Sequence, residues 1–321
     1  MSVPTSAEWL ELTPDEFFER RDACPVCYMP YGYPEAHGVY NPLGVDFYIS
    51  TAVVRRAASH GGIIAPPFAW HIDEEPAFNW GIDSCGMGEQ VVAAIPCDLF
   101  LHNVLYHIRA MDARGFRAAA LITGHCVPGL DEDVRLLIDY YRRRTGTPMQ
   151  IVWEVAYDGP LAPEKLPEHD THAGTVETSI AWALHPELAH PERLGKPARR
   201  AFEGGGNEAF DAFCAPKGFP EAEKWTVPSV EYGRYCTERA GDKLAELARR
   251  LLASYDDTRP RPAAPDFNRT AELWASFVRI TSRYWRSTMT VGQYDRHESH
   301  PAVPGWDVFG VEDAAGPRRN G

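Results

Sequence analysis

Long apolar runs are absent from this sequence, and none approaches the roughly 20 residues that a helix needs to cross a bilayer. The first 22 residues are polar and acidic, without the apolar core of a signal peptide. Positive charge is scarce, since 32 lysines and arginines are set against 45 acidic residues, for a net charge of −13. A nucleic-acid partner requires a basic face, which the sequence does not offer. We therefore expect a cytoplasmic protein with no membrane or nucleic-acid partner.

Cysteines are also few, and their number is odd: the 321 residues contain seven. This is unlike the dense framework of a disulfide-stabilised protein. Cys24 and Cys27 form a CxxC pair, but no second pair follows at the spacing of a zinc ribbon. The segment also has the pattern of a strand, so we favour buried thiols over a redox or zinc-ribbon module.

The sequence does contain a regular alternation of short apolar runs and amphipathic segments. Strands are predicted at residues 24–32, 62–68, 117–123 and 149–157. Helices are predicted at residues 46–60, 98–114, 131–145, 174–188, 232–255 and 271–289. The alternation predicts an α/β fold with a mainly parallel central sheet flanked by helices.

A proline-rich break near residue 259 divides the chain into two predicted parts. Residues 1–258 would form the α/β domain. Residues 259–321 would form a C-terminal extension with an aromatic helix, packed on that domain or on a neighbouring subunit. Neither part contains an internal repeat.

Polar side chains follow the predicted strands, at the rim where ligands bind in parallel sheets. The first group is Glu35, His37 and Asp46. Glu35 and His37 are two residues apart, so on an extended backbone they project to the same side. Asp46 comes nine residues after His37, at a predicted helix start. Carboxylates and imidazoles together suit zinc, manganese or iron, although this segment taken alone is better explained as a Glu-x-His pair in an ordinary surface loop.

Two further segments add ligand-type residues at the same rim. His125 follows the third predicted strand, and His71 follows the second. Residues 168–179, EHDTHAGTVETS, concentrate carboxylates and imidazoles before and into a helix, with His172 and Glu177 the notable members. Taken alone, Glu177 is also explained as a favourable first-turn acid, and His172 as a loop histidine.

Three motifs in this order resemble the creatininase superfamily. The pattern E-x-H-G-x-x-x-P-L-x-x-D stands at residues 35–46. A strand ending in N-G-H is represented by TGH at residues 123–125, and H-A-G-x-x-E-T-S is complete at residues 172–179. The resemblance extends over roughly residues 24–253, and it implies a divergent member with the three-layer α/β fold of that family.

The resemblance implies a site for two divalent metal ions, zinc or manganese, with iron as a third candidate. The expected ligands form two groups that share Asp46 as a bridge: Glu35, Asp46 and His125, and His37, Asp46 and Glu177. Water activated by the two ions would be the nucleophile. His172 would transfer its proton to a leaving nitrogen, and Asp170 would orient or stabilise that imidazole. Glu177 is thus a candidate both as a ligand and as part of the catalytic machinery.

The sequence departs from the family pattern close to these residues. Val127 stands where creatininase places a glutamate ligand, so either Glu177 serves the second ion or that ion is bound less completely. Thr123 replaces the usual asparagine, and Ala36 replaces the usual glutamine. These changes indicate that creatinine itself is not the substrate, while the ligands of the first ion are intact.

We therefore predict a hydrolase that opens a cyclic amide or a related C–N bond of a small polar substrate. Two alternatives stay open on the same fold. One is hydrolysis of a C–C bond in a cyclic diketone, as in 3-dehydro-scyllo-inosose hydrolase, and the other is a non-catalytic, oligomeric binding protein. Val127 supports the binding protein, whereas His172 and Glu177 oppose it. The resemblance also implies a homo-oligomer, commonly a hexamer.

Overall fold

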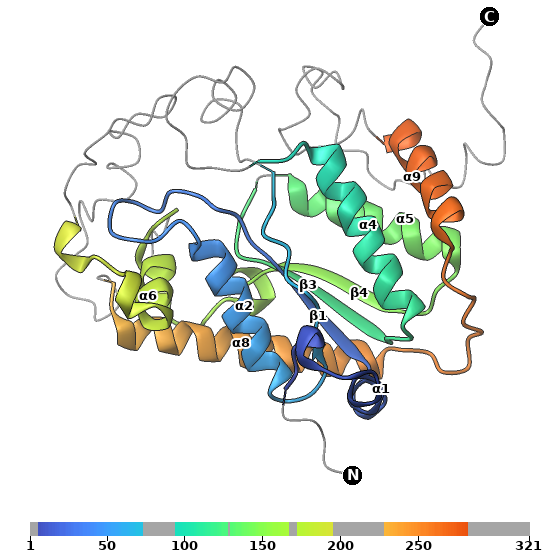
Figure 1. Cartoon of the computed structure of the whole chain (residues 1–321), viewed down its shortest axis with the longest axis horizontal. Helices are drawn as coiled ribbons and strands as arrows, with labels where there is room; N and C mark the ends of the chain where they lie inside the picture. Colours follow the sequence, from blue (N-terminus) through green and yellow to red (C-terminus); the bar gives the residue numbers. More distant parts are fainter. Residues whose placement is uncertain (1–5, 73–93, 128, 167–171, 195–227, 282–321) are drawn as a thin grey trace, which may run out of the picture.

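A four-stranded parallel sheet forms the centre of the protein (Figure 1). The computed structural model describes residues 6–72, 94–127, 129–166, 172–194 and 228–281. The strands are β1 (Val26–Tyr31), β2 (Ile63–Ile64), β3 (Ala118–Thr123) and β4 (Gln150–Val155). Their order is β2-β1-β3-β4, and each neighbouring pair is parallel. The predicted parallel sheet is confirmed.

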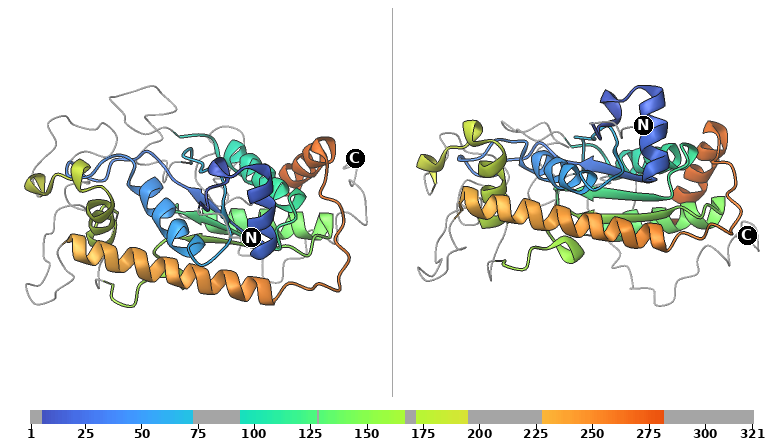
Figure 2. Two further views of the ribbon diagram at one scale, coloured as in Figure 1. Left: turned by 60° about the horizontal axis from the view of Figure 1, so that its bottom comes forward. Right: turned by 90° about the horizontal axis from the view of Figure 1, so that it is seen from below.

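Helices cover both faces of this sheet, which gives the predicted three layers (Figure 2). The helices are α1 (Pro14–Ala23), α2 (Val45–Ala58), α4 (Cys97–Ala113), α5 (Leu130–Thr145), α6 (Thr175–Leu184), α8 (Val230–Ala253) and α9 (Phe267–Thr281). Short 3-10 turns lie at Trp9–Glu11, Gly159–Leu161, Pro186–Leu188 and Pro191–Arg193. One face of the sheet packs against α2, α6 and α8, and the other against α4, α5 and α9. None of the helices in the described ranges is long and apolar enough to cross a membrane.

The two central strands, β1 and β3, are buried on both faces because helices lie above and below them. Alternate residues of β1 enter different cores: Tyr28 packs with α2 and α8, whereas Met29 packs with α4 and α5. Cys27 is buried in the second of these cores, Cys24 is partly buried, and both are free thiols. The edge strand β4 instead alternates buried and partly exposed residues.

Several element boundaries differ from the sequence prediction for local reasons. The second strand is shorter than predicted: its ladder with β1 covers Ile63–Ile64, and Pro66 and Pro67 then follow without the N–H groups that a ladder needs. Beyond the prolines, Phe68 pairs with Tyr31 as an isolated bridge. Helix α6 ends one turn early, because Pro186 disfavours helical backbone at the residue before it. Helix α8 begins earlier than predicted, because the Ser229 side chain accepts from the backbone N–H of Tyr232 and caps it.

The C-terminal helix α9 belongs to the same core as α4 and α5. Its buried residues Leu273, Phe277 and Ile280 pack into the core cluster on that face of the sheet. The connecting segment is held by Arg261, whose guanidinium donates to the Asp112 carboxylate at 2.9 Å. The predicted helix began at residue 271, whereas α9 begins at Phe267. Residues 282–289 of that prediction lie outside the described residues, and the division at residue 258 stays a prediction.

The strand order creates a divergence at the carboxyl ends of β1 and β3. From β1 the chain passes through α2 to β2 on one side, and it then passes through α4 to β3 on the other side of β1. The two connections lie on opposite faces of the sheet. Such a point is where open α/β sheets bind their ligands, because the loops that follow the two strands separate there.

Candidate metal centre

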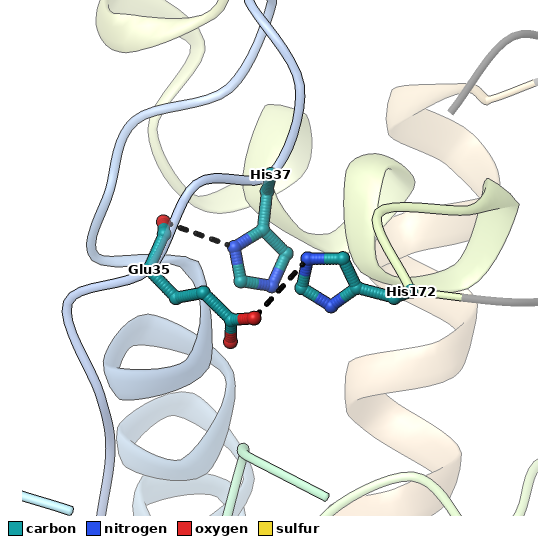
Figure 3. Close-up of side chains that lie close together, drawn as sticks. All are labelled: Glu35, His37 and His172. Atoms are coloured by element: carbon teal, nitrogen blue, oxygen red, sulfur yellow. Dashed lines mark hydrogen bonds and ion pairs between the residues drawn. The ribbon is translucent and has the colours of Figure 1, made fainter. Parts of the chain in front are cut away.

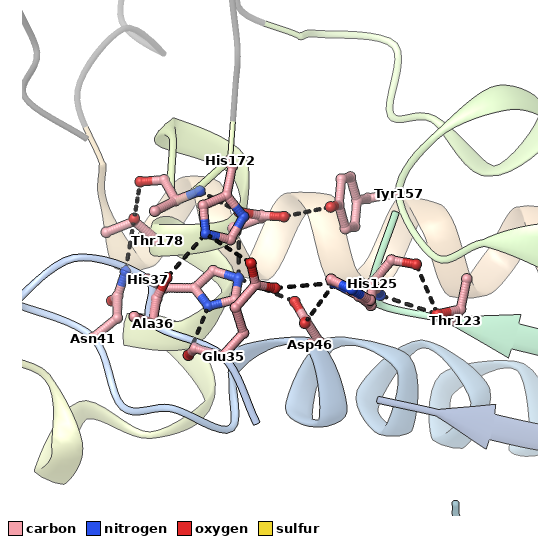
Figure 4. Close-up of polar contacts among 12 residues, drawn as sticks. Glu35, Ala36, His37, Asn41, Asp46, Thr123, His125, Tyr157, His172 and Thr178 are labelled. Atoms are coloured by element: carbon pink, nitrogen blue, oxygen red, sulfur yellow. Dashed lines mark hydrogen bonds and ion pairs between the residues drawn. The ribbon is translucent and has the colours of Figure 1, made fainter. Parts of the chain in front are cut away.

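The candidate ligands converge on this point from four parts of the chain (Figure 4). Glu35 and His37 lie in the loop after β1, and Asp46 lies in the first turn of α2. His125 follows β3, and Glu177 lies in the first turn of α6. The structure therefore brings together all five residues that the sequence analysis named as metal ligands.

Gly124 permits the close approach of β3 to α2 on which this convergence depends. A Cβ atom at this position would lie 2.0 Å from the carbonyl oxygen of Asp46. No side chain fits there, so the close approach of the Asp46 backbone requires glycine at the position before His125. It allows the end of β3 to lie against the first turn of α2, and this places His125 beside the Asp46 carboxylate.

The first ligand group consists of Glu35, Asp46 and His125. Nδ1 of His125 lies 3.0 Å from Oε2 of Glu35 and 3.3 Å from Oδ2 of Asp46. The ligand-type atoms of the three side chains all lie within 4.8 Å of one another. Two carboxylates and one imidazole at this spacing are a donor set that zinc and manganese accept.

The second ligand group consists of His37, Asp46 and Glu177. Nε2 of His37 lies 3.0 Å from Oδ1 of Asp46 and 3.6 Å from Oε2 of Glu177. Asp46 thus directs Oδ2 toward His125 and Oδ1 toward His37. One carboxylate that offers an oxygen to each of two groups has the arrangement of a bridging ligand.

Backbone carbonyls select which nitrogen of each histidine faces the cluster. Nδ1 of His37 lies 3.2 Å from the carbonyl oxygen of Glu35, and Nε2 of His125 lies 3.2 Å from that of Ile72. A carbonyl can only accept, so these nitrogens are the N–H donors. In the neutral form that binds a metal ion, the lone pairs are then on Nε2 of His37 and Nδ1 of His125, the two nitrogens that face the carboxylates.

The buried polar atoms of the cluster lack the partners that a purely structural role would require. Within the described residues, Glu35 Oε2, His37 Nε2 and Asp46 Oδ2 are buried without a hydrogen-bond partner. Leaving such atoms unsatisfied is costly unless another group binds them. All three atoms face their own ligand group, so the residues present fit divalent cations.

The pKa values of the two ligand histidines, His37 and His125, are both raised above the ordinary value. Burial disfavours the imidazolium of His37, yet Asp46, with Glu177 and Glu35, outweighs burial and raises the pKa of His37 to about 10. Burial is likewise outweighed at His125, where Glu35 and Asp46 hold the pKa well above its ordinary value. The cluster therefore attracts positive charge, which divalent cations supply in place of protons when histidines bind as neutral ligands.

His172 lies beside Glu35 and His37 (Figure 3). Its Nε2 donates to the carbonyl oxygen of Ala36 at 2.9 Å and lies 3.4 Å from Oε1 of Glu35. Its ring centre is 4.4 Å from that of His37. The His172 side chain is 21% exposed, whereas the Glu35 side chain is 6% exposed. Asp170, the predicted partner of His172, lies outside the described residues.

Comparisons with known proteins identify the family of this chain. The creatininase family model, described as creatinine amidohydrolase, matches residues 10–253. The chain belongs to the creatininase family. A curated relative, the creatinine amidohydrolase of Pseudomonas putida, is 26% identical over 198 residues, which are 57% of this chain and 74% of the relative.

Solved creatininase structures share the fold. A creatininase described as the Mn form aligns with a TM-score of 0.59 at 21% identity, covering 77% of this chain and 99% of that one. A mutant creatininase of Zn-Zn type aligns with the same TM-score and identity, covering 78% and 99%. A mutant complexed with creatine also aligns at 0.59 and 21%, covering 77% and 98%. The three-layer creatininase fold expected from the sequence is confirmed.

Val127 has a structural role in this member of the creatininase family. Its side chain is buried in the core cluster that contains residues of α4 and α5. It supplies no metal ligand, as the sequence indicated. Among the described residues, the unshared carboxylate of the second group is that of Glu177.

Two residues beside the ligand groups were given no structural role in the sequence analysis. Tyr157, just after β4, donates a hydrogen bond from its hydroxyl to Oε1 of Glu177. Thr123, the last residue of β3, accepts at Oγ1 from the backbone N–H of His125 at 3.0 Å. Both stand at the carboxyl ends of strands, where ligands bind in parallel sheets. This position is the sequence signal from which a role at the site could have been predicted for them.

His71 was placed at the rim by the sequence, and the structure buries it beneath His125. The two ring centres are 4.9 Å apart. Burial and the neighbouring His125 hold the pKa of His71 well below its ordinary value, so it is neutral. Its Nε2 lies 3.4 Å from the hydroxyl of Thr123. His71 thus supports the first ligand group without belonging to it.

Proposed function

We propose that this chain is a hydrolase that binds two divalent metal ions and opens a cyclic amide or a related C–N bond of a small polar substrate. The observation that carries the proposal is the Asp46 carboxylate, which offers one oxygen to each of two buried ligand groups. The unpartnered atoms of those groups support it. So do the Mn and Zn-Zn forms of creatininases with the same fold.

In this proposal Asp46 would serve as a ligand in both sets. Glu35 and His125 complete the first set of ligands, and His37 and Glu177 complete the second. Divalent ions in such a pair lower the pKa of water and polarise a carbonyl group. The chain's own contribution is to fix the ligand atoms in a buried place and to hold both histidines in the tautomers that leave the facing nitrogens unprotonated.

His172 is the residue that we assign to proton transfer. A neutral imidazole that donates from Nε2 to the Ala36 carbonyl has its lone pair on Nδ1. That nitrogen can accept a proton from the attacking water and return it to the leaving ring nitrogen, which balances the hydrolysis. The partial exposure of His172 leaves it accessible to a substrate that enters from solvent. Asp170 is kept as the proposed partner that orients this imidazole.

Metal analysis combined with a substrate panel tests the proposal. We expect two zinc or manganese ions per purified chain, and turnover of at least one member of a lactam and cyclic-amide panel. His172→Ala should abolish this turnover with unchanged metal content. His190→Ala, a surface histidine that pairs with Glu192, is the matched control and should keep full activity. Full activity in His172→Ala would refute the proton-transfer role, and a chain without metal would refute the metal site.

The same panel separates the two alternative functions. Turnover of cyclic diketones without turnover of amides would show that the enzyme hydrolyses a C–C bond and not a C–N bond. The proposed metal site would be unchanged. Two bound ions with no turnover of either class would favour a binding protein. We also keep the homo-oligomer and the cytoplasmic location as proposals that rest on sequence, and analytical ultracentrifugation tests the first of them.

A further inference from the structure

Glu177 differs from the other carboxylates of the cluster in how firmly it is held. Its Oε1 accepts from the Tyr157 hydroxyl, and its Oε2 accepts from the backbone N–H of Ala173 at 2.5 Å. By contrast, Oε2 of Glu35 and Oδ2 of Asp46 contact Nδ1 of His125, at 3.0 and 3.3 Å, and that residue is itself a candidate ligand. A glutamate has three side-chain torsions, so two hydrogen bonds at its tip remove most of its freedom.

The backbone beneath Glu177 is held in an uncommon conformation. Ala173 has a φ of 55°, and it is the one non-glycine residue with a positive φ in the part of the chain that the structure describes. Such a conformation persists only where its surroundings fix it. The carbonyl of Ala173 accepts from the Tyr40 hydroxyl at 3.2 Å and from the Thr178 hydroxyl at 2.9 Å. These contacts direct the Ala173 N–H at Glu177.

Tyr157 reaches Glu177 from a separate element. It lies two residues after β4, and Glu177 lies in α6, so the hydrogen bond joins the rim of the sheet to the helix that carries the ligand. The bond leaves Oε2 of Glu177 facing Nε2 of His37 at 3.6 Å. No corresponding bond joins Tyr157 to Glu35 or His125 among the described contacts, so its influence is confined to one ligand group.

We infer that Tyr157 is a positioning residue for the second metal ion, and that it acts by holding the Glu177 carboxylate toward His37 and Asp46. The inference rests on the proposed function, since it presupposes that Glu177 binds an ion. It goes beyond that function by making the affinity of one ion, and not of the other, depend on a tyrosine hydroxyl that is itself no ligand. Contacts of this kind change metal affinity by roughly tenfold to hundredfold.

The test is calorimetric titration of Zn²⁺ into metal-free protein. Wild type is expected to bind two ions, and Glu177→Gln should lose one of them, which identifies the second site. Tyr157→Phe removes only the hydroxyl, and it should weaken that same site by roughly tenfold to hundredfold while leaving the first unchanged. Tyr141→Phe is the matched control, because Tyr141 is also buried and donates to a buried carboxylate, that of Asp112, at 2.9 Å. It should leave both affinities unchanged.

The outcomes separate the inference from the function on which it rests. If wild type binds two ions and Glu177→Gln loses one, but Tyr157→Phe keeps both affinities, the inference is wrong and the metal site stands. Equal weakening of both sites in Tyr157→Phe would show a general structural effect and would also overturn it. If wild type fails to bind a second ion, the two-ion proposal falls as well. In a Glu177→Gln background, Tyr157→Phe should have no further effect on Zn²⁺ binding, because the hydroxyl acts through the glutamate.

Discussion

Replacement of the shared carboxylate, Asp46→Asn, is the sharpest test of the two-ion arrangement. Asparagine has nearly the same shape, but it has no charge and only one oxygen. Both groups are weakened at once, because one Asp46 oxygen lies 3.0 Å from His37 Nε2 and the other 3.3 Å from His125 Nδ1. One of these oxygens becomes an amide nitrogen, which cannot bind a cation, and the other loses its negative charge. Glu35→Gln and Glu177→Gln each alter one group alone. The geometry therefore predicts the loss of both ions in the first variant and of one ion in each of the others.

The size of the effect follows from the linkage between binding and folding. A ligand present at one hundred times its dissociation constant stabilises the folded state by about 2.7 kcal/mol. Two such ions contribute about 5.4 kcal/mol in wild type. With an unfolding entropy of about 2.1 cal/mol/K per residue over 321 residues, each ion should raise the melting temperature by about 4 °C. Thermal melts with Zn²⁺ and with a chelator should thus show a full shift in wild type, half of it in Glu177→Gln and in Glu35→Gln, and none in Asp46→Asn.

Asp112→Asn is the control for loss of a buried carboxylate as such. Asp112 is buried and accepts from Tyr141, Thr147 and Arg261, far from the ligand groups along the chain. This variant should melt at a lower temperature but keep the full shift with Zn²⁺. A full shift in Asp46→Asn would refute the bridging assignment. Complete loss of the shift in both single-group variants would show one cooperative site in place of two separable ones.

Three further predictions follow from other parts of the structure. The raised pKa of His37, about 10 against an ordinary 6.5, means that its charged form stabilises the metal-free protein below pH 6.5 and that this contribution is lost as the pH rises through 10. Binding of Zn²⁺ at pH 7 should therefore release protons, which titrations in two buffers of different ionisation enthalpy will measure; an absence of release would contradict the shift. Gly124→Ala should destabilise the protein by about 1–3 kcal/mol or more and weaken Zn²⁺ binding, because its Cβ would lie 2.0 Å from the Asp46 carbonyl, and urea unfolding with metal titration checks both effects. Phe277→Ala should cost about 3–5 kcal/mol in urea unfolding, since Phe277 is fully buried against the main core, and a negligible cost would show that α9 is dispensable.

Much of the fold could be predicted from the sequence because the local hydrophobic patterns agree with the burial of the same residues in the folded protein. The apolar runs of β1 and β3 lie between two helical layers, so the same residues that gave the strand pattern also form the core. The strand order was not predictable, because pairing of β1 with both β2 and β3 depends on contacts distant in sequence. The errors in predicted helix and strand boundaries came from capping and helix-breaking residues. For example, Ser229 caps α8, which therefore begins before the apolar pattern does.

The candidate site was predictable where its residues stand in recognisable motifs. Glu35 and His37 are close together in sequence, and their shared orientation follows from a period of two. The hydrogen bond from Tyr157 to Glu177 joins residues that are 20 positions apart, and no local sequence pattern predicts it. The tautomer of His125 depends on the Ile72 carbonyl, 53 residues earlier in the chain. Such contacts arise from the packed fold, so they become visible only in three dimensions.

The charge of the cluster gives a physical reason for a pair of ions in place of one. Three carboxylates, those of Glu35, Asp46 and Glu177, are buried beside two ligand histidines that have neutral tautomers available. With both histidines neutral, as they must be to bind as ligands, one divalent cation would leave a net negative charge in a buried place, which is costly. Two divalent cations against three carboxylates leave one net positive charge. That balance suits a reaction in which a single negative charge develops on oxygen, as when water adds to an amide carbonyl.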